Sequence, residues 1–221
     1  MINEQDLDDF VRSELRERNI LLVDGHWLLG GHLDGRHLCV KEYVRKEKII
    51  LYPILLHRYA AMLVGQIPQE LLEPDPPLII GIERGGARLA QAITAFMLPR
   101  LQSQARERLM CITAVRTPLR FVFDPREEPY LTRFTRAFIV EDFLVMGRKV
   151  RSVVDLIKPC EINVAAILAL GERGKVADYE VRGLQRITLL KLAPAVEYED
   201  CLQCAEGIPP TQAPGDVYQK R

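Results

Sequence analysis

Five short apolar runs in the later part of the chain constrain its fold more than any other feature. They are LIIGI (78–82), LMCITAV (109–115), AFIV (137–140), NVAAILAL (163–170) and ITLLKL (187–192), and a helical pattern, KVRSVVDLIK (149–158), lies between two of them. Strands that are apolar throughout, rather than at every second position, are typical of parallel sheets covered on both faces. We therefore predict an α/β fold with a mostly parallel sheet flanked by helices.

The N-terminal part of the chain follows a different pattern. Amphipathic spacing predicts a helix over about 3–18, and Pro53 can open a second helix that extends to about residue 64. Between these helices, Asp24-Gly25 separates two apolar runs and predicts a β-hairpin. We expect three parts: a small N-terminal α+β hood (1–66), an α/β core (67–195) and a C-terminal tail (196–221).

The composition excludes several classes of partner. The 221 residues include 30 basic and 30 acidic side chains, so the formal net charge is zero, which disfavours nucleic acid and anionic lipid as partners. The longest clean apolar run, 164–170, falls far short of the roughly 18 residues that a membrane span needs. The first residues are acidic and polar, unlike a secretory signal, so we expect a cytoplasmic protein.

Five scattered cysteines do not suggest a disulfide framework. Cys201 and Cys204 form a C-x-x-C, but a zinc ion needs four ligands and no second Cys/His pair lies nearby in sequence. We interpret the two as structural thiols in a C-terminal turn; a redox dithiol, or zinc held by two tails of a dimer, are the alternatives. His26, His32 and His37 are expected to be surface or hydrogen-bonded histidines.

The residues best suited to binding or catalysis lie at the ends of two predicted strands. Glu83-Arg84-Gly85-Gly86 follows the strand at 78–82, and adjacent glycines before a helix let backbone N–H groups approach an anion. The alternative is a tight strand-to-helix turn. Glu141-Asp142 follows the strand at 137–140 and can accept hydrogen bonds from sugar hydroxyls or hold hydrated Mg²⁺. The alternative here is a solvated or arginine-paired strand end.

Together these segments resemble the type I phosphoribosyltransferases, and the flanking segments narrow the resemblance to the orotate-specific group. GHWLLGGHLDGRH (25–37) is similar to the "GHF-L-SG-HSD-Y" stretch of that group, AVRT (114–117) to its "VRK", and CLQCAEGIPPTQAPG (201–215) to its "CPLC-GIP-PG" ending. The resemblance implies the type I phosphoribosyltransferase fold. It also implies transfer of ribose 5-phosphate from phosphoribosyl pyrophosphate (PRPP) to a nitrogenous acceptor, with Mg²⁺ carried by PRPP, in a homodimer that shares its active sites.

The resemblance also assigns roles to residues. Glu141 and Asp142 would bind the ribose hydroxyls, and Arg116 and Arg120 would act on the diphosphate from the catalytic loop. The backbone of Glu83, Arg84, Gly85 and Gly86 would hold the pyrophosphate, and Gly147 matches the family's 5′-phosphate loop. Lys149 replaces the last hydroxyl of that loop and can offer charge to a phosphate at a different site from the usual one.

Two loops depart from the family pattern. The phosphate loop "T-T-G-G-T/S" is replaced by a segment without hydroxyls, VMGRK (145–149), in which only Gly147 matches. The catalytic loop "VRK-x-x-K-x-HG" loses its first lysine to Thr117 and its His-Gly pair to Val122-Phe123, while Arg120 replaces the second lysine. Arginine keeps the charge of lysine but not its compact ammonium group.

Two hypotheses follow, and they belong to different classes of function. In the first, the protein is a phosphoribosyltransferase acting on orotate or another nitrogenous acceptor. In the second, it is a catalytically inactive descendant that senses a phosphorylated ligand or binds a protein partner, with Phe121-Val122-Phe123 as part of the partner surface.

Overall fold

The computed structural model describes residues 4–29, 38–173 and 183–212. Its central sheet has six strands in the order β10-β9-β8-β5-β6-β7. All neighbouring strands are parallel except β7, which pairs antiparallel with β6 at the sheet edge. The strands are β5 (Leu78–Ile82), β6 (Cys111–Arg116), β7 (Phe121–Val122), β8 (Arg136–Leu144), β9 (Asn163–Arg173) and β10 (Arg186–Leu192). The predicted α/β class with a mostly parallel sheet is confirmed.

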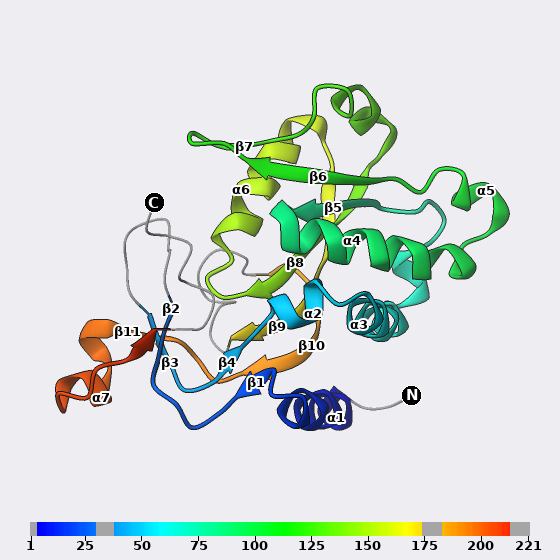
Figure 1. Cartoon of the computed structure of the whole chain (residues 1–221). Coiled ribbons are helices and arrows are strands. Elements are labelled where there is room, and N and C mark those ends of the chain that lie inside the picture. Colours follow the sequence, from blue (N-terminus) through cyan, green and yellow to red (C-terminus); the bar gives the residue numbers. More distant parts are fainter. Residues whose placement is uncertain (1–3, 30–37, 174–182, 213–221) are drawn as a thin grey trace.

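Helices cover both faces of this sheet (Figure 1). One face, with Ile79 and Phe138, packs against α1 (Glu4–Glu17), α3 (Pro53–Gln66) and α4 (Glu83–Met97). The opposite face, with Ile80 and Ile139, packs against α6 (Arg148–Ile157). Burial on both faces explains why the strands are apolar throughout. The shorter helices are α2 (Glu47–Ile50), α5 (Ser103–Arg106), η1 (Gln69–Leu71), η2 (Leu98–Arg100), η3 (Glu128–Arg133), η4 (Lys158–Cys160) and η6 (Tyr198–Asp200).

The strand order contains a topological switch point between β5 and β8. These strands are neighbours in the sheet, but α4 after β5 packs on one face and α6 after β8 packs on the other. The two helices diverge at the carboxyl ends of β5 and β8, and open α/β sheets bind ligands at such a point. The fold therefore singles out this edge before any side chain is considered.

The two ends of the chain share a second, four-stranded sheet of order β11-β3-β2-β12. Its strands are β2 (Trp27–Leu29), β3 (Leu38–Val40), β11 (Val196–Glu197) and β12 (Thr211–Gln212), and α7 (Leu202–Ala205) lies between the last two along the chain. A separate pair joins β1 (Leu21–Leu22) to β4 (Tyr43–Val44). The hood and the tail thus contact each other directly, and the core that holds α1 and α3 is continuous with the central sheet. The residue boundaries of the three expected parts stay predictions.

Three local predictions differ from the structure. The Asp24-Gly25 hairpin is wrong: β1 pairs with β4 and β2 with β3, because the two runs beside Asp24 each pair with a segment further along the chain rather than with each other. The helix expected after Gly85-Gly86 begins earlier, at Glu83, and contains both glycines. Phe121 and Phe123 are buried against the face that carries α6, so they cannot form the suggested partner surface.

Helices in the described part of the chain are all too short or too polar to cross a membrane.

Candidate functional site

Five charged side chains meet at the switch point, and we call them the switch-point cluster. Glu141 and Asp142 lie near the end of β8 and are buried, at 4% and 6% exposure. Glu83 is the first residue of α4, and Lys149 lies in the first turn of α6. Lys46 reaches the same place from the segment that precedes α2.

Ion pairs connect the members of this cluster. Lys149 Nζ lies 2.6 Å from Glu83 Oε2 and 3.8 Å from Glu141 Oε1, so one ammonium group links the starts of both helices to β8. Lys46 Nζ lies 2.8 Å from Asp142 Oδ2. Asp142 Oδ1 also accepts a hydrogen bond from the backbone N–H of Phe143 at 2.8 Å. Each buried carboxylate therefore has a cationic neighbour, as buried charges require.

The two adjacent carboxyl groups titrate in opposite directions. Burial, followed by the negative charge of Asp142, raises the pKa of Glu141 well above its ordinary value. Burial also acts to raise the pKa of Asp142, but Lys46 and the hydrogen bond from Glu141 outweigh it and the net shift is downward. Of the two groups, Asp142 beside Lys46 gives up its proton more readily, and Glu141 holds its proton more strongly than an ordinary glutamate does.

The glycines of α4 bring its first turn into contact with β8. A Cβ added to Gly85 would lie 2.3 Å from Asp142 Oδ2, and one added to Gly86 would lie 2.4 Å from the carbonyl oxygen of Val140. Only glycine permits this approach, so the tight-turn interpretation of the double glycine is correct as far as the packing goes. The same packing fixes the start of α4 directly over the acidic pair.

The backbone at Glu83 is strained. Its φ is 51°, in the left-handed region that non-glycine residues rarely adopt. Such residues cost of order 1–3 kcal/mol and cluster at functional sites. Because the strain falls at the strand-to-helix junction where an anion-binding turn was predicted, it supports a binding role for this turn.

Two helix N-termini open at this edge without side-chain caps. Neither Ile82, before α4, nor Gly147, before α6, carries a capping hydrogen bond from its side chain. Gly147 has a φ of 66°, which glycine adopts without penalty. Uncapped N–H groups and the helix dipole together favour a bound anion such as phosphate.

The structure brings together most of the predicted site residues. Those at the switch point are Glu83, Gly85, Gly86, Glu141, Asp142, Gly147 and Lys149. Arg84 is exposed on α4, and Arg116 and Arg120 are exposed on the β6–β7 hairpin, where a Thr117–Arg120 backbone hydrogen bond closes the turn. Within the described residues, the side chains of these three arginines form no ion pair with the cluster.

Sequence reasoning missed Lys46. It lies far from Asp142 along the chain, in a polar segment whose pattern resembles an ordinary solvated turn. A buried carboxylate needs a cation, but the sequence does not say which one supplies it.

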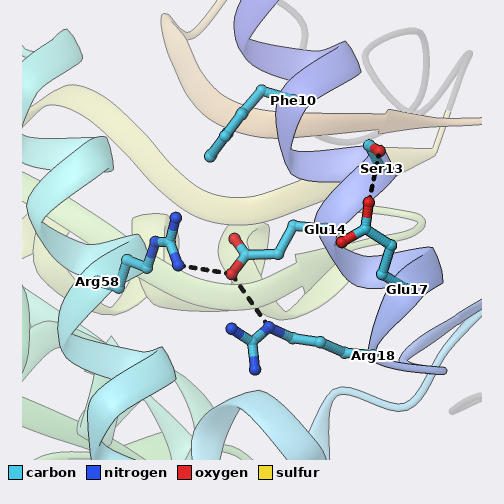
Figure 2. Close-up of a pocket in the computed structure, with 6 residues that line it drawn as sticks. All are labelled: Phe10, Ser13, Glu14, Glu17, Arg18 and Arg58. Atoms are coloured by element: carbon cyan, nitrogen blue, oxygen red, sulfur yellow. Dashed lines mark hydrogen bonds and ion pairs between the residues drawn. The ribbon is translucent and has the colours of Figure 1, made fainter.

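A separate concavity of about 460 Å³ lies between α1 and α3. Figure 2 shows Glu14 at its centre, with Arg58 Nη1 donating to Glu14 Oε1 at 2.6 Å and Arg18 Nε donating to the same oxygen at 3.1 Å. The buried Tyr59 hydroxyl donates to Glu14 Oε2 at 2.9 Å. Glu14 therefore links α1 to α3 through hydrogen bonds from residues of its own chain.

Comparison with known proteins gives one consistent set of relatives. The chain is 27% identical over 206 residues to an orotate phosphoribosyltransferase of Thermotoga petrophila, covering 92% of this chain and 96% of that protein. It is 28% identical over 212 residues to the orotate phosphoribosyltransferase of Heliobacterium modesticaldum, covering 95% and 96%. No family model matches the chain.

Solved structures agree on the fold. The orotate phosphoribosyltransferase of Aeropyrum pernix superposes with a TM-score of 0.57 at 16% identity, covering 82% of this chain and 93% of that one. That of Francisella tularensis superposes with a TM-score of 0.55 at 12% identity, covering 90% of each chain.

Proposed function

We propose that this chain, which has the type I phosphoribosyltransferase fold, transfers ribose 5-phosphate from PRPP to orotate or a related nitrogenous acceptor. The chain is similar in sequence to orotate phosphoribosyltransferases along more than nine-tenths of its length. The observation that carries the proposal is the position of Glu141 and Asp142. They are buried at the topological switch point, between two uncapped helix N-termini.

Each part of the donor has a matching group in this arrangement. Glu141 and Asp142 provide acceptors for the ribose hydroxyls. The first turn of α4 provides backbone N–H groups for the diphosphate, and the start of α6, with Gly147 and Lys149, provides them for the 5′-phosphate. Mg²⁺ would enter with PRPP, bound to its diphosphate oxygens, as part of the substrate.

The two lysines give the site a way to accept a highly anionic ligand. In the structure Lys46 and Lys149 neutralise carboxylates. When PRPP binds, the ribose hydroxyls donate hydrogen bonds to the acidic pair and the ammonium groups turn towards phosphate oxygens, so each group keeps a polar partner. The bond from the anomeric carbon to the diphosphate oxygen then breaks and the diphosphate leaves. The acceptor nitrogen forms a new bond to that carbon and loses its proton to solvent.

We assign the arginines of the β6–β7 hairpin to the active site of a second subunit. Arg116 and Arg120 are exposed, and Leu119 at the turn is 95% exposed. We infer a homodimer in which this hairpin reaches the neighbouring subunit's switch-point cluster and places guanidinium groups on the leaving diphosphate.

Pyrophosphate release from PRPP and Mg²⁺, measured with and without orotate, tests the proposal. We expect orotate-dependent release by the unaltered protein and a loss of about 100-fold or more in Asp142→Asn, because binding of the donor depends on this carboxylate. Asp155→Asn is the matched control, since Asp155 is exposed on α6, outside the switch-point cluster, and pairs with Arg151 of the same helix. Equal activity in Asp142→Asn and Asp155→Asn would contradict the assignment of the site.

A second candidate is ligand binding without transfer. Its specific support is the segment before α6, where Leu144, Val145 and Met146 provide no hydroxyl to a phosphate, together with the lysines that already neutralise the acidic pair. Saturable PRPP binding without pyrophosphate release in the presence of an acceptor-base panel would favour this candidate over the enzyme.

A further inference from the structure

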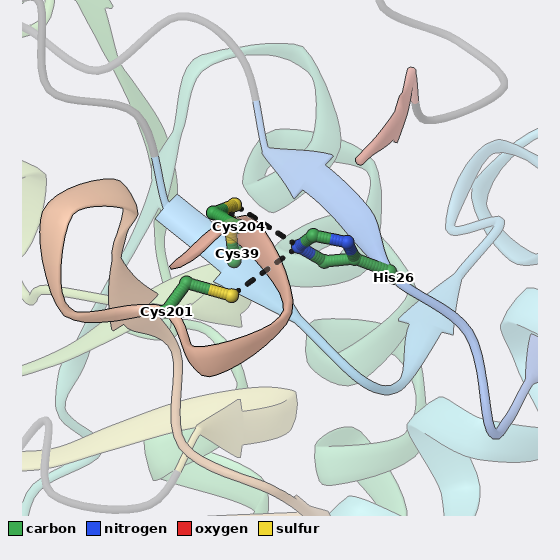
Figure 3. Close-up of side chains that lie close together, drawn as sticks. All are labelled: His26, Cys39, Cys201 and Cys204. Carbon is green, nitrogen blue, oxygen red and sulfur yellow. Dashed lines mark hydrogen bonds between the residues drawn. The ribbon is translucent and has the colours of Figure 1, made fainter. Parts of the chain in front are cut away.

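Four potential metal ligands from distant parts of the chain lie together beside the four-stranded sheet. They are His26, Cys39, Cys201 and Cys204, and their ligand atoms all lie within 4.8 Å of one another. Figure 3 shows the three sulfur atoms and the imidazole directed towards a common centre. None of these residues belongs to the switch-point cluster, so the group is a second site with its own chemistry.

The distances fit a tetrahedral ion. Zn–S bonds of about 2.3 Å and Zn–N bonds of about 2.0–2.1 Å place tetrahedral ligand atoms about 3.8 Å apart for S···S and about 3.6 Å apart for S···N. Cys39 Sγ and Cys204 Sγ are 3.6 Å apart, and His26 Nε2 lies 3.3 Å from Cys201 Sγ and 3.4 Å from Cys204 Sγ. An ion at the centre needs only small adjustments of these side chains.

The local backbone also suits a metal site. Cys201 is the residue before α7, and Cys204 lies in the first turn of this helix. Residues three positions apart lie on the same side of a helical turn, so the two thiols face the same way. His26 Nδ1 is buried without a partner in the described parts of the chain, so Nε2, on the sulfur side, makes the polar contacts of the ring.

The sheet beside the cluster is too small to be stable by itself. Its four strands have only two or three residues each. Its two halves come from opposite ends of the chain: β11 pairs with β3 at Cys39, and β12 pairs with β2 next to His26. Small units of this kind are commonly stabilised by a structural metal ion.

We propose that His26, Cys39, Cys201 and Cys204 bind one structural Zn²⁺ ion that fastens the C-terminal tail to the N-terminal hood. Three thiolates and one imidazole form a closed Cys₃His set with no open coordination position, which is the pattern of a structural rather than a catalytic zinc site. The ligands come from one chain, so no second copy is needed. No second Cys/His pair lies near Cys201 and Cys204 in the sequence, because the other two candidate ligands are close to them only in space.

Zinc content of the full chain, purified under reducing conditions without an immobilised-metal column, tests the proposal. We expect one zinc per chain in the unaltered protein and none in Cys204→Ser after dialysis. Cys160→Ser is the matched control, because Cys160 is a free thiol outside the cluster, and it should retain one zinc.

Two further measurements use the unaltered chain and do not depend on the folding of a variant. Replacement of zinc by Co²⁺ should give the visible bands of a tetrahedral ion and strong thiolate-to-cobalt charge transfer. Alkylation followed by mass spectrometry should label Cys39, Cys201 and Cys204 only after a chelator is added. A chain that binds neither Zn²⁺ nor Co²⁺, that contains iron instead, or that joins two of these cysteines in a disulfide would overturn the proposal.

Discussion

Asp142 keeps a charge in a buried position because a lysine from another part of the fold reaches it. The Lys46–Asp142 pair lowers the pKa of the carboxyl group, whereas neighbouring Glu141 is left with a raised pKa because burial and Asp142 dominate there. The end of β8 therefore presents one carboxylate, on Asp142, and one carboxyl group, on Glu141, that holds its proton more strongly than an ordinary glutamate does. This division of roles between adjacent acids is typical of binding and catalytic sites.

The raised pKa of Glu141 makes the stability of the protein depend on pH. Above the ordinary glutamate pKa the unfolded chain loses this proton while the folded protein retains it, so the free energy of unfolding falls as pH rises through that window. Glu141→Gln removes the titration. We expect its free energy of unfolding, relative to the unaltered protein, to increase as pH rises above the ordinary glutamate pKa.

Urea unfolding at a series of pH values measures this difference, with Asp155→Asn as the control whose offset should not change with pH. An offset for Glu141→Gln that decreases over the same range would show that Glu141 ionises readily in the folded protein.

At the scale of elements, the apolar runs predicted the sheet. The close packing of the first turn of α4 against β8 explains why two adjacent glycines stand there. The strands could be predicted because burial on both faces leaves a direct mark on sequence. The pairing of β1 to β4 could not, because these strands have only two or three residues and the two runs beside Asp24 do not pair with each other.

Glycine substitutions separate close packing from helix propensity. Gly86→Ala places a Cβ 2.4 Å from the Val140 carbonyl oxygen, a backbone atom that cannot move aside, so we expect destabilisation of about 1–3 kcal/mol. Gly65→Ala, on α3, meets nothing within 4 Å and should be neutral or stabilising by up to about 1 kcal/mol.

Thermal or urea unfolding of the two variants measures the contrast. Equal stability of Gly86→Ala and Gly65→Ala would mean that α4 does not lie against β8 as closely as the structure has it.

At the scale of the whole molecule, both sites depend on contacts that no local pattern encodes. The C-x-x-C was visible in the sequence, but His26 and Cys39 come from the other end of the chain, as Lys46 does for the acidic pair. The α1 edge and the β6–β7 hairpin lie at opposite ends of the central sheet (Figure 1), which leaves the hairpin free to reach a second subunit.

Subunit complementation tests the proposed sharing of active sites. Asp142→Asn and Arg116→Ala should each be nearly inactive alone. After the two are mixed and the subunits exchanged, half of the dimers carry one intact site, so about a quarter of the original activity should return. No recovery despite demonstrated subunit exchange would place Arg116 in the site of its own chain or outside the reaction.

The central claim is that the switch-point cluster binds PRPP. A calorimetric titration of the unaltered protein with PRPP and Mg²⁺, run in parallel with Asp142→Asn and Asp155→Asn, tests it most directly. We predict saturable binding to one site per chain in the unaltered protein and in Asp155→Asn, and its loss in Asp142→Asn. Absence of binding at millimolar PRPP, or equal binding in all three proteins, would contradict the claim.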